Sequence, residues 1–332
     1  MSLSDHSQAA HSFLRLIKSK APPGLKRGLG ILGRRLGTQV LSTPPLRNLA
    51  NRSYNRLGRH FRDVFVRAFS EAAVKQDFLW TDTFLQHSIR VPVTVDYRYS
   101  WNVALSCRWS EPGVRRLSEL LVAVAPADAV VFDVGANHGY VSYPFLASGL
   151  RCVLFEPQAV CVEFIRKTAL LNGFTPTIEA CVVSNVEGEL DFIESACPWF
   201  SGLAPNIAQQ GLAKEIRRVR SVTLDAYCDR TGLRPFFVKC DVEGHEWEVL
   251  DGAWQIINNI RPVFSIEIFP SGRRPAIFDL FNGAGYTCFQ IGHRRFRNLR
   301  NGEEFCSSDA SDFIFCASDS PLIRCLEHAG PY

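Results

Sequence analysis

Residues 130–156 read VVFDVGANHGYVSYPFLASGLRCVLFE, and this stretch decides the fold. An apolar run at 130–134 leads into a turn with Gly135 and Gly139, and a second apolar run at 151–155 ends at Glu156. A strand, a glycine-containing turn, a helix and a second strand with a terminal acid build a nucleotide-sized pocket in α/β sheets. The stretch therefore predicts an enzyme that uses an adenosine-containing cofactor.

The remainder of the chain repeats this alternation of strand and helix. We expect strands at 130–134, 151–155, 177–183, 235–240, 262–268, 286–290 and 312–317, and helices at about 139–148, 158–172, 225–231, 245–257 and 273–284. Apolar runs bounded by turn residues suit strands that are buried on both faces. The pattern predicts an α/β fold with a doubly wound, mostly parallel seven-stranded sheet. The last two strands lie close together in the sequence, which favours an antiparallel pair at one edge.

The N-terminal part of the chain differs in charge from the rest. Residues 1–70 contain thirteen Lys and Arg and two acids, whereas the rest of the chain contains 24 Lys and Arg and 31 acids. Glycines and prolines interrupt residues 19–67, which predicts an extended or weakly helical leader. Residues 13–17 and 61–69 place apolar side chains at helical spacing beside basic ones, so weak contact with a membrane surface or nucleic acid stays open. A solvated segment that packs on the body or on a partner is the preferred interpretation.

Three parts are expected along the chain. The alternating Val91, Val93 and Val95 predict a strand, paired in a hairpin with residues 103–107, and a helix follows from Glu111. We expect a basic, partly irregular leader at 1–85, a hairpin and helix covering module at 86–126, and a catalytic domain at 127–320.

Composition limits the class of protein. The chain has 332 residues and 46% hydrophobic residues, as in a globular protein with a core. Its eleven cysteines include no Cys-x-x-Cys pair, so we expect reduced, buried thiols and no zinc site. No apolar stretch approaches the roughly 18–20 residues of a spanning helix, and residues 1–12 lack the features of a secretory signal. We expect a cytoplasmic protein, with membrane association through the leader left open.

The first turn departs from the Gly-x-Gly-x-x-Gly pattern of nicotinamide and flavin proteins. Pyrophosphate requires several close backbone N–H groups at a helix N-terminus, whereas a cofactor without phosphate requires more side-chain polarity. Asp133 can accept hydrogen bonds from a cationic amino-acid group or from nearby backbone, and Asn137 offers both a donor and an acceptor. The turn therefore favours a cofactor that carries no pyrophosphate.

Glu156 lies 21 residues after Gly135, at the end of the second strand. A carboxylate about 20 residues after the first glycine is placed to accept both hydroxyls of an adenosine ribose. The alternative is that Glu156 caps the helix that follows Pro157. We favour the ribose role because of the turn upstream.

A second polar cluster, KCDVEGHE at 239–246, follows the apolar residues 236–238. Asp241 and Glu243 are two residues apart and share a face in extended backbone, and Gly244 permits a sharp turn into a helix. The alternative is that one of these acids caps that helix. His245 follows directly, as a candidate base, although lone histidines near turns are more often structural.

Two further residues belong to this prediction. Glu267 is a third acid at a strand end, and His138 flanks the expected pocket as another candidate base. A divalent metal held by Asp241, Glu243 and Glu267 is chemically reasonable, because hard cations select carboxylate oxygens. Nothing in the spacing requires a metal, so none is expected.

Five ordered segments resemble the FkbM family of S-adenosylmethionine-dependent methyltransferases over about residues 110–290. They are FDVGANHGYVS at 132–142, FEP at 155–157, VTLD at 222–225, VKCDVEGHE at 238–246 with VLDGA at 249–253, and Arg261-Pro262 before Glu267. Cys240 stands where the family commonly has an aliphatic residue, which is a conservative difference. The first hundred residues carry no part of this resemblance.

The resemblance implies a class I methyltransferase, Rossmann-like, with S-adenosylmethionine as cofactor and O-methylation of a hydroxyl on a sugar, glycan or secondary metabolite. It implies that Asp133, Gly135, Asn137 and Gly139 hold the methionine portion, Glu156 the ribose, and Ser184 and Asn185 the adenine. Asp241 and Glu243 would border the methyl-transfer site, with His245 beside them.

Other readings and the choice of acceptor stay open at this point. The alternatives are an RNA- or anionic-membrane-binding protein with a non-catalytic α/β body, and an RNA methyltransferase that uses the basic loop 294–297. We expect the loop 196–218, with Trp199, Phe200 and Asn206, and the hairpin before Glu111 to select a small-molecule or glycan acceptor. The alternative, which we prefer for Trp199 and Phe200, is that these two side chains only pack as part of a lid.

Overall fold

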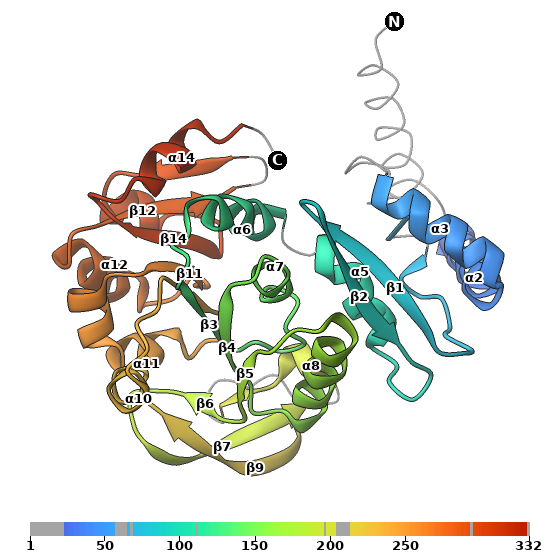
Figure 1. Cartoon of the computed structure of the whole chain (residues 1–332), viewed down its shortest axis with the longest axis horizontal. Coiled ribbons are helices and arrows are strands. Elements are labelled where there is room, and N and C mark those ends of the chain that lie inside the picture. Colours follow the sequence, from blue (N-terminus) through green and yellow to red (C-terminus); the bar gives the residue numbers. More distant parts are fainter. Residues whose placement is uncertain are drawn as a thin grey trace, which may run out of the picture. The chain divides into compact units, whose positions relative to one another are not determined.

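A computed structural model describes residues 23–56, 65–66, 69–109, 112–195, 197–203, 213–292 and 295–330. These residues form two compact units, one within 1–83 and 88–110 and the other within 84–87 and 111–332 (Figure 1). No helix in the described ranges is long and apolar enough to cross a bilayer. Residues 13–17, Asn206 and Arg294, and most of 61–69, lie outside the described residues.

The first unit contains more helix than the sequence indicated. Its elements are α2 (Pro23–Ser42), α3 (Pro44–Arg56), β1 (Phe78–Phe84), β2 (His87–Val93) and α5 (Ser100–Trp109). The expectation of an irregular leader is wrong over 23–56, because Pro44 and Pro45 occupy the first turn of α3, where proline is tolerated. The expected hairpin is also wrong, since β2 pairs with β1 and residues 103–107 are helical.

Aromatic side chains form the core of this first unit. Trp80 and Trp101 are buried and meet edge to face, with ring centroids 4.9 Å apart. Their neighbour Tyr54 donates a hydrogen bond of 3.0 Å to the Leu105 carbonyl, and the Trp101 indole donates one of 2.7 Å to the Phe69 carbonyl. The polar atoms of Tyr54 and Trp101 are therefore satisfied inside the unit, whereas the buried Trp80 Nε1 has no hydrogen-bond partner among the described residues.

The second unit is built on an eight-stranded sheet in the order β13-β12-β14-β11-β10-β3-β4-β5. Its strands are β3 (Val130–Val134), β4 (Arg151–Phe155), β5 (Thr177–Glu179), β10 (Phe237–Cys240), β11 (Val263–Glu267), β12 (Tyr286–Ile291), β13 (Phe296–Leu299) and β14 (Asp312–Ala317). The five strands from β11 to β5 are parallel, and β14, β12 and β13 add antiparallel pairs at one edge. The predicted doubly wound, mostly parallel sheet is confirmed, with β13 as an additional strand.

Helices cover both faces of this sheet. They are α6 (Pro112–Val124), α7 (Tyr143–Ala147), α8 (Ala159–Asn172), α10 (Leu224–Thr231), α11 (Glu246–Asp251), α12 (Arg274–Gly283), α13 (Gly302–Cys306) and α14 (Leu322–His328). Val130, Phe132 and Val134 of β3 share one core cluster with residues of α10, α11 and α12. On the other face, the Phe237 ring lies 5.5 Å from the Phe145 ring of α7.

A smaller sheet in the same unit has the order β6-β9-β7-β8 and was not predicted. Its strands are β6 (Val182–Val183), β7 (Gly188–Ser195), β8 (Gly202–Leu203) and β9 (Ala213–Val222). The strand expected at 177–183 is therefore divided between β5 of the large sheet and β6 of the small one. In Figure 1 the long strands β7 and β9 lie along the lower edge of the unit.

The order of strands fixes the position of a crevice. From the central strand β3 the chain proceeds to β4 and β5 on one side, and it later returns to β10 and β11 on the other side. Connections that leave in opposite directions open a crevice at the carboxyl ends of the two central strands. In this molecule that point lies between β3 and β10.

Candidate functional site

A cavity with about 720 Å³ of empty space, part of it open to solvent, lies at the carboxyl ends of β3, β4 and β10. Six of the predicted site residues line it: Gly135, Asn137, Glu156, Asp241, Glu243 and His245. Four do not line it: Asp133, Gly139, Ser184 and Asn185.

The turn after β3 is in close contact with the segment after β10. Gly135 has a φ of +71°, and a Cβ atom there would lie 1.9 Å from the Asp241 carbonyl oxygen. The N–H groups of Gly135 and Ala136 both donate to the Phe155 carbonyl at 3.1 Å, which ties the turn to β4. Only glycine satisfies both the backbone conformation and the close approach.

Glu156 organises the backbone on both sides of the cavity mouth. Its Oε2 accepts a 2.7 Å hydrogen bond from the Asn137 N–H, and its Oε1 accepts one of 2.8 Å from the Gln158 N–H. The side chain is 2% exposed, and burial raises its pKa to about 7, against the effect of these two hydrogen bonds. These bonds use two of the roughly four acceptor positions of the carboxylate, and Glu156 lines the cavity.

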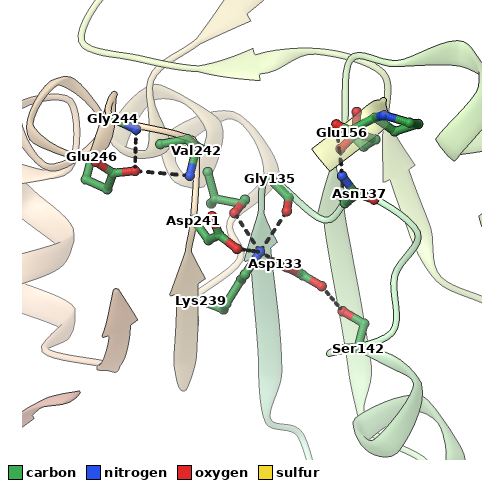
Figure 2. Close-up of polar contacts among 12 residues, drawn as sticks. Asp133, Gly135, Asn137, Ser142, Glu156, Lys239, Asp241, Val242, Gly244 and Glu246 are labelled. Carbon is green, nitrogen blue, oxygen red and sulfur yellow. Dashed lines mark hydrogen bonds and ion pairs between the residues drawn. The ribbon is translucent and has the colours of Figure 1, made fainter. Parts of the chain in front are cut away.

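Lys239 is a residue of the site that the sequence analysis did not assign. Its ammonium group donates a 2.7 Å hydrogen bond to the Gly135 carbonyl and lies 3.4 Å from Asp133 and 3.5 Å from Asp241 (Figure 2). The Lys239 side chain is 8% exposed and the Asp133 side chain 1% exposed. Lys239 therefore joins the ends of β3 and β10 through a nearly buried ion pair.

Asp133 stabilises the turn after β3 and does not line the cavity. Its Oδ2 accepts a 2.7 Å hydrogen bond from the Ser142 hydroxyl, and its Oδ1 faces Lys239 (Figure 2). Gly139, at a φ of +76°, packs on Ile165 and Tyr143, where a Cβ would lie 3.2 Å from each. Asp133 and Gly139 therefore hold the turn in place without lining the cavity.

The segment after β10 is held by Glu246. Its Oε1 accepts hydrogen bonds from the Val242 N–H at 3.2 Å and the Gly244 N–H at 3.0 Å (Figure 2). Between them Glu243 has a φ of +55°, which is unusual for a residue with a side chain. Glu246 therefore fixes a turn that presents Glu243 to the cavity.

The carboxyl groups at this edge repel one another. Burial, with repulsion from Asp241 and Glu246, raises the pKa of Glu243 to about 7. Burial and repulsion from Asp241 raise the pKa of Glu267 to about 9, and the pKa of Asp312 is also raised, mainly by burial. Within the described ranges, no group of three or more His, Cys, Asp or Glu side chains is arranged to hold a metal ion.

His245 connects the cavity to the residues after β6. Its Nε2 lies 2.9 Å from the Ser184 hydroxyl, and its Nδ1 lies 3.5 Å from Glu248. Asn185 donates a 2.8 Å hydrogen bond to Asp251. Burial lowers the pKa of His245, against the effect of Glu248. Ser184 thus contacts His245, which lines the cavity, whereas Asn185 is exposed and does not line it.

His138, the other candidate base, is fully buried and does not line the cavity. Burial lowers its pKa to about 3, so it stays neutral in ordinary buffers. Its ring lies 5.3 Å from that of Phe164 and 5.1 Å from that of Trp199. Its position indicates a packing role rather than proton transfer.

The small sheet supplies one wall of the cavity. Phe192 of β7, Trp199 of the short helix η1 (Pro198–Phe200) and Leu203 of β8 line it. The Pro198 carbonyl accepts hydrogen bonds from Asn137 at 3.3 Å and from Gln158 at 3.1 Å. Trp199 was anticipated within the acceptor loop, whereas Phe192, Leu203 and Gln158 carried no recognisable signal in the sequence.

Comparison with protein families gives one match to this part of the chain. Residues 133–288 match the family described as the methyltransferase FkbM domain. This region is similar to the methyltransferase FkbM domain. The match covers the cavity and the strands that surround it, and it confirms the resemblance found in the sequence. A comparison with curated proteins found no significant match.

Solved structures similar to the chain are distant from it. Methyltransferase FkbM from Methylobacillus flagellatus has 14% identity and a TM-score of 0.38, over 66% of this chain and 54% of that one. A SAM-dependent methyltransferase from Agrobacterium tumefaciens has 10% identity and a TM-score of 0.43, over 76% and 73%. Magnesium protoporphyrin IX methyltransferase from Synechocystis, with bound SAM, has 12% identity and a TM-score of 0.37, over 65% and 83%. The similarity spans about half of the Methylobacillus protein.

Proposed function

We propose that the FkbM-like domain transfers a methyl group from S-adenosylmethionine to a hydroxyl group of a sugar, glycan or secondary metabolite. The observation that carries the proposal is the single cavity lined by both Asn137 and Glu156 and by Asp241 and Glu243. Asn137 and Glu156 suit a cofactor that donates hydrogen bonds, and Asp241 and Glu243 suit an acceptor hydroxyl that must lose a proton.

The residues present fit S-adenosylmethionine. The buried Oδ1 of Asn137 has no hydrogen-bond partner among the described residues, and it would accept from a donor group of the cofactor. The free acceptor positions of Glu156 would take the ribose hydroxyls. Asp133 and Lys239 would act from beneath the turn, by holding its backbone in place.

Asp241 and Glu243 are the candidates for handling the acceptor proton. S-adenosylmethionine supplies an electrophilic methyl group on a sulfonium. The acceptor oxygen must lose its proton as the new bond forms, and a base with a pKa near the working pH suits this step. The pKa of Glu243 is about 7, so we assign the proton to Glu243 and assign orientation of the hydroxyl to Asp241, whose partner is Lys239.

The function is tested with labelled S-adenosylmethionine and an extract of the host, followed by identification of the labelled product. With that acceptor, Glu243→Gln should lower kcat by about 10²-fold or more and leave cofactor affinity unchanged. The kcat of the parent should fall as the pH drops below about 7, because Glu243 then becomes protonated.

Glu187→Gln is the matched control, since Glu187 is an exposed acid outside the cavity. Cofactor binding without transfer to any hydroxyl would contradict O-methylation. Full turnover of Glu243→Gln would contradict the role of Glu243 alone.

A further inference from the structure

Helices α2 and α3 carry charge of one sign. Residues 23–56 contain no Asp or Glu and seven basic residues: Lys26, Arg27, Arg34, Arg35, Arg47, Arg52 and Arg56. Arg34 pairs with Glu71 at 2.7 Å, and the Arg47 guanidinium donates to the Leu41 carbonyl at 2.8 Å. The side chains of Arg35, Arg52 and Arg56 are exposed, so the positive charge is presented to solvent.

Leucines are exposed among these arginines. Leu36 is 52% exposed, Leu46 43% and Leu49 62%. Each is a large apolar side chain on a helix that also contributes to the core, since Leu41 of α2 and Tyr54 of α3 are buried. Burial of these three leucines against an apolar partner would be favourable.

On α3 the exposed leucines and arginines fall on one side. Leu46, Leu49, Arg52 and Arg56 are separated by three, three and four residues, which places them along one face of a helix. Tyr54, on the opposite side, is buried and bonded to Leu105. We call these four residues the Leu/Arg face of α3. Arg35 and Leu36 of α2 are a second exposed pair of the same kind.

We propose that the Leu/Arg face of α3 binds the surface of an anionic lipid bilayer. An amphipathic helix of this composition lies in the plane of the interface, with leucines at the boundary of headgroups and acyl chains and arginines on the anionic headgroups. The exposed leucines and the exposed arginines of this face are both explained by this one partner. The inference is independent of the proposed methyl transfer, because no residue of the face belongs to the cavity.

The observations favour a bilayer over nucleic acid. A phosphate backbone attracts arginines but gains nothing from exposed leucines. Proteins that bind single strands offer aromatic side chains on which bases stack. The only aromatic residue of α2 and α3 is Tyr54, and it is buried.

The test is sedimentation of the full-length protein with vesicles of phosphatidylcholine, with and without phosphatidylglycerol. The protein should sediment with the vesicles that contain phosphatidylglycerol and should not sediment with the neutral vesicles. Arg52→Gln/Arg56→Gln should weaken binding by about 30-fold, since each arginine near an anionic surface contributes about fivefold. Leu46→Ser/Leu49→Ser should weaken it by about tenfold or more, at unchanged charge.

The matched control is Leu170→Ser/Arg166→Gln, which alters an exposed leucine and an exposed arginine of α8 and should leave binding unchanged. Circular dichroism of each variant separates loss of binding from loss of folding. Three results would each overturn the proposal. They are failure of the folded parent to bind anionic vesicles, a loss of vesicle binding by the control variant as large as that of the face variants, and binding of Leu46→Ser/Leu49→Ser as tight as that of the parent.

Two further measurements address other occupants of the face. A shift of labelled RNA that the arginine variant abolishes and the leucine variant preserves would assign the surface to nucleic acid instead. A dimer in sedimentation equilibrium that Leu46→Ser/Leu49→Ser dissociates, without vesicle binding by the parent, would assign it to a second copy of the chain. Either result contradicts the bilayer assignment.

Discussion

Lys239 illustrates what a single residue contributes to this site. A lysine at the end of an apolar strand, next to three acids, looks like a solvated charge in the sequence. In the structure it is nearly buried and links Asp133, the Gly135 carbonyl and Asp241. The link depends on the pairing of β3 with β10, which are separated by about a hundred residues, so sequence spacing could not indicate it.

Lys239→Met should therefore destabilise the protein. Removing one partner of a buried ion pair typically costs about 3–5 kcal/mol, because the other charge is left uncompensated. Asp133→Asn in the same chain should recover part of this loss, since asparagine can still accept from Ser142. Urea denaturation of the parent, the single variant and the double variant measures both effects. Equal stability of Lys239→Met and parent would show that the ion pair contributes nothing.

Glu156 was predicted more completely, because its position relative to Gly135 follows from local chain geometry. The sequence left two roles open, a ribose contact and a cap of the following helix. Hydrogen bonds from the Asn137 and Gln158 N–H groups give Glu156 a role similar to the helix cap. Because Glu156 also lines the cavity, the ribose contact stays a proposal. One carboxylate has enough acceptor positions for both.

At the scale of elements, the turn after β3 and the segment after β10 depend on each other. Gly135→Ala and Gly149→Ala both place an alanine at positive φ, but only the former meets a neighbour within 4 Å. The positive φ alone costs about 1–2 kcal/mol. Gly135→Ala should lose about 1–3 kcal/mol beyond this, because the Asp241 backbone must move.

Thermal or urea unfolding of the two glycine variants measures the difference, and the Gly149 variant acts as the control for backbone strain. Cofactor affinity should fall only in the Gly135 variant. Equal losses of stability in the two variants would show that the contact between the two turns is not tight.

Three neighbouring strands carry acids at the same edge of the sheet, and this arrangement couples stability to pH. Asp241 follows β10, Glu267 ends β11, and Asp312 lies opposite Glu267 on β14. The pKa of Glu267 is raised from 4.5 to about 9, so the folded state holds a proton that the unfolded chain has released. The stability associated with Glu267 is therefore complete below about pH 4.5 and is lost as the pH rises toward 9.

Glu267→Gln should remove this dependence. The variant should have a Tm a few degrees above that of the parent at about pH 8–9, and the difference should shrink toward about pH 5. Differential scanning fluorimetry across this range measures it, with Glu163→Gln on the surface of α8 as the control. A constant difference at every pH would show that Glu267 titrates normally.

Helices and strands were predictable where their buried residues form a continuous or periodic apolar pattern in the sequence. The bounds of β3 and β4 follow from apolar runs between turn residues, and α8 was predicted to within one residue. The small sheet was not predicted, because β7 is exposed along much of its length and pairs Arg218 of β9 with Asp191, a pattern that reads as a polar loop. In α2, Gly37 suggested a break, yet it packs on Ala72, where a Cβ would lie 2.9 Å away.

At the scale of the whole molecule, the order of strands does most to place the candidate site. The reversal between β3 and β10 brings together residues from 135 to 245, and this convergence requires the complete sheet. The sequence predicted the sheet and the family, since ordered motifs survive in a linear pattern. It did not predict the wall formed by the small sheet, because long-range pairing of charged strands carries no periodic apolar signal.

A crystal structure of the protein with S-adenosylhomocysteine tests the central claim most directly. The account predicts the ligand inside this cavity, with its ribose hydroxyls on the Glu156 carboxylate and a donor group on Asn137 Oδ1. Asp241 and Glu243 should border its sulfur atom. A ligand bound elsewhere, or a cavity still empty in crystals grown with saturating ligand, would contradict the account.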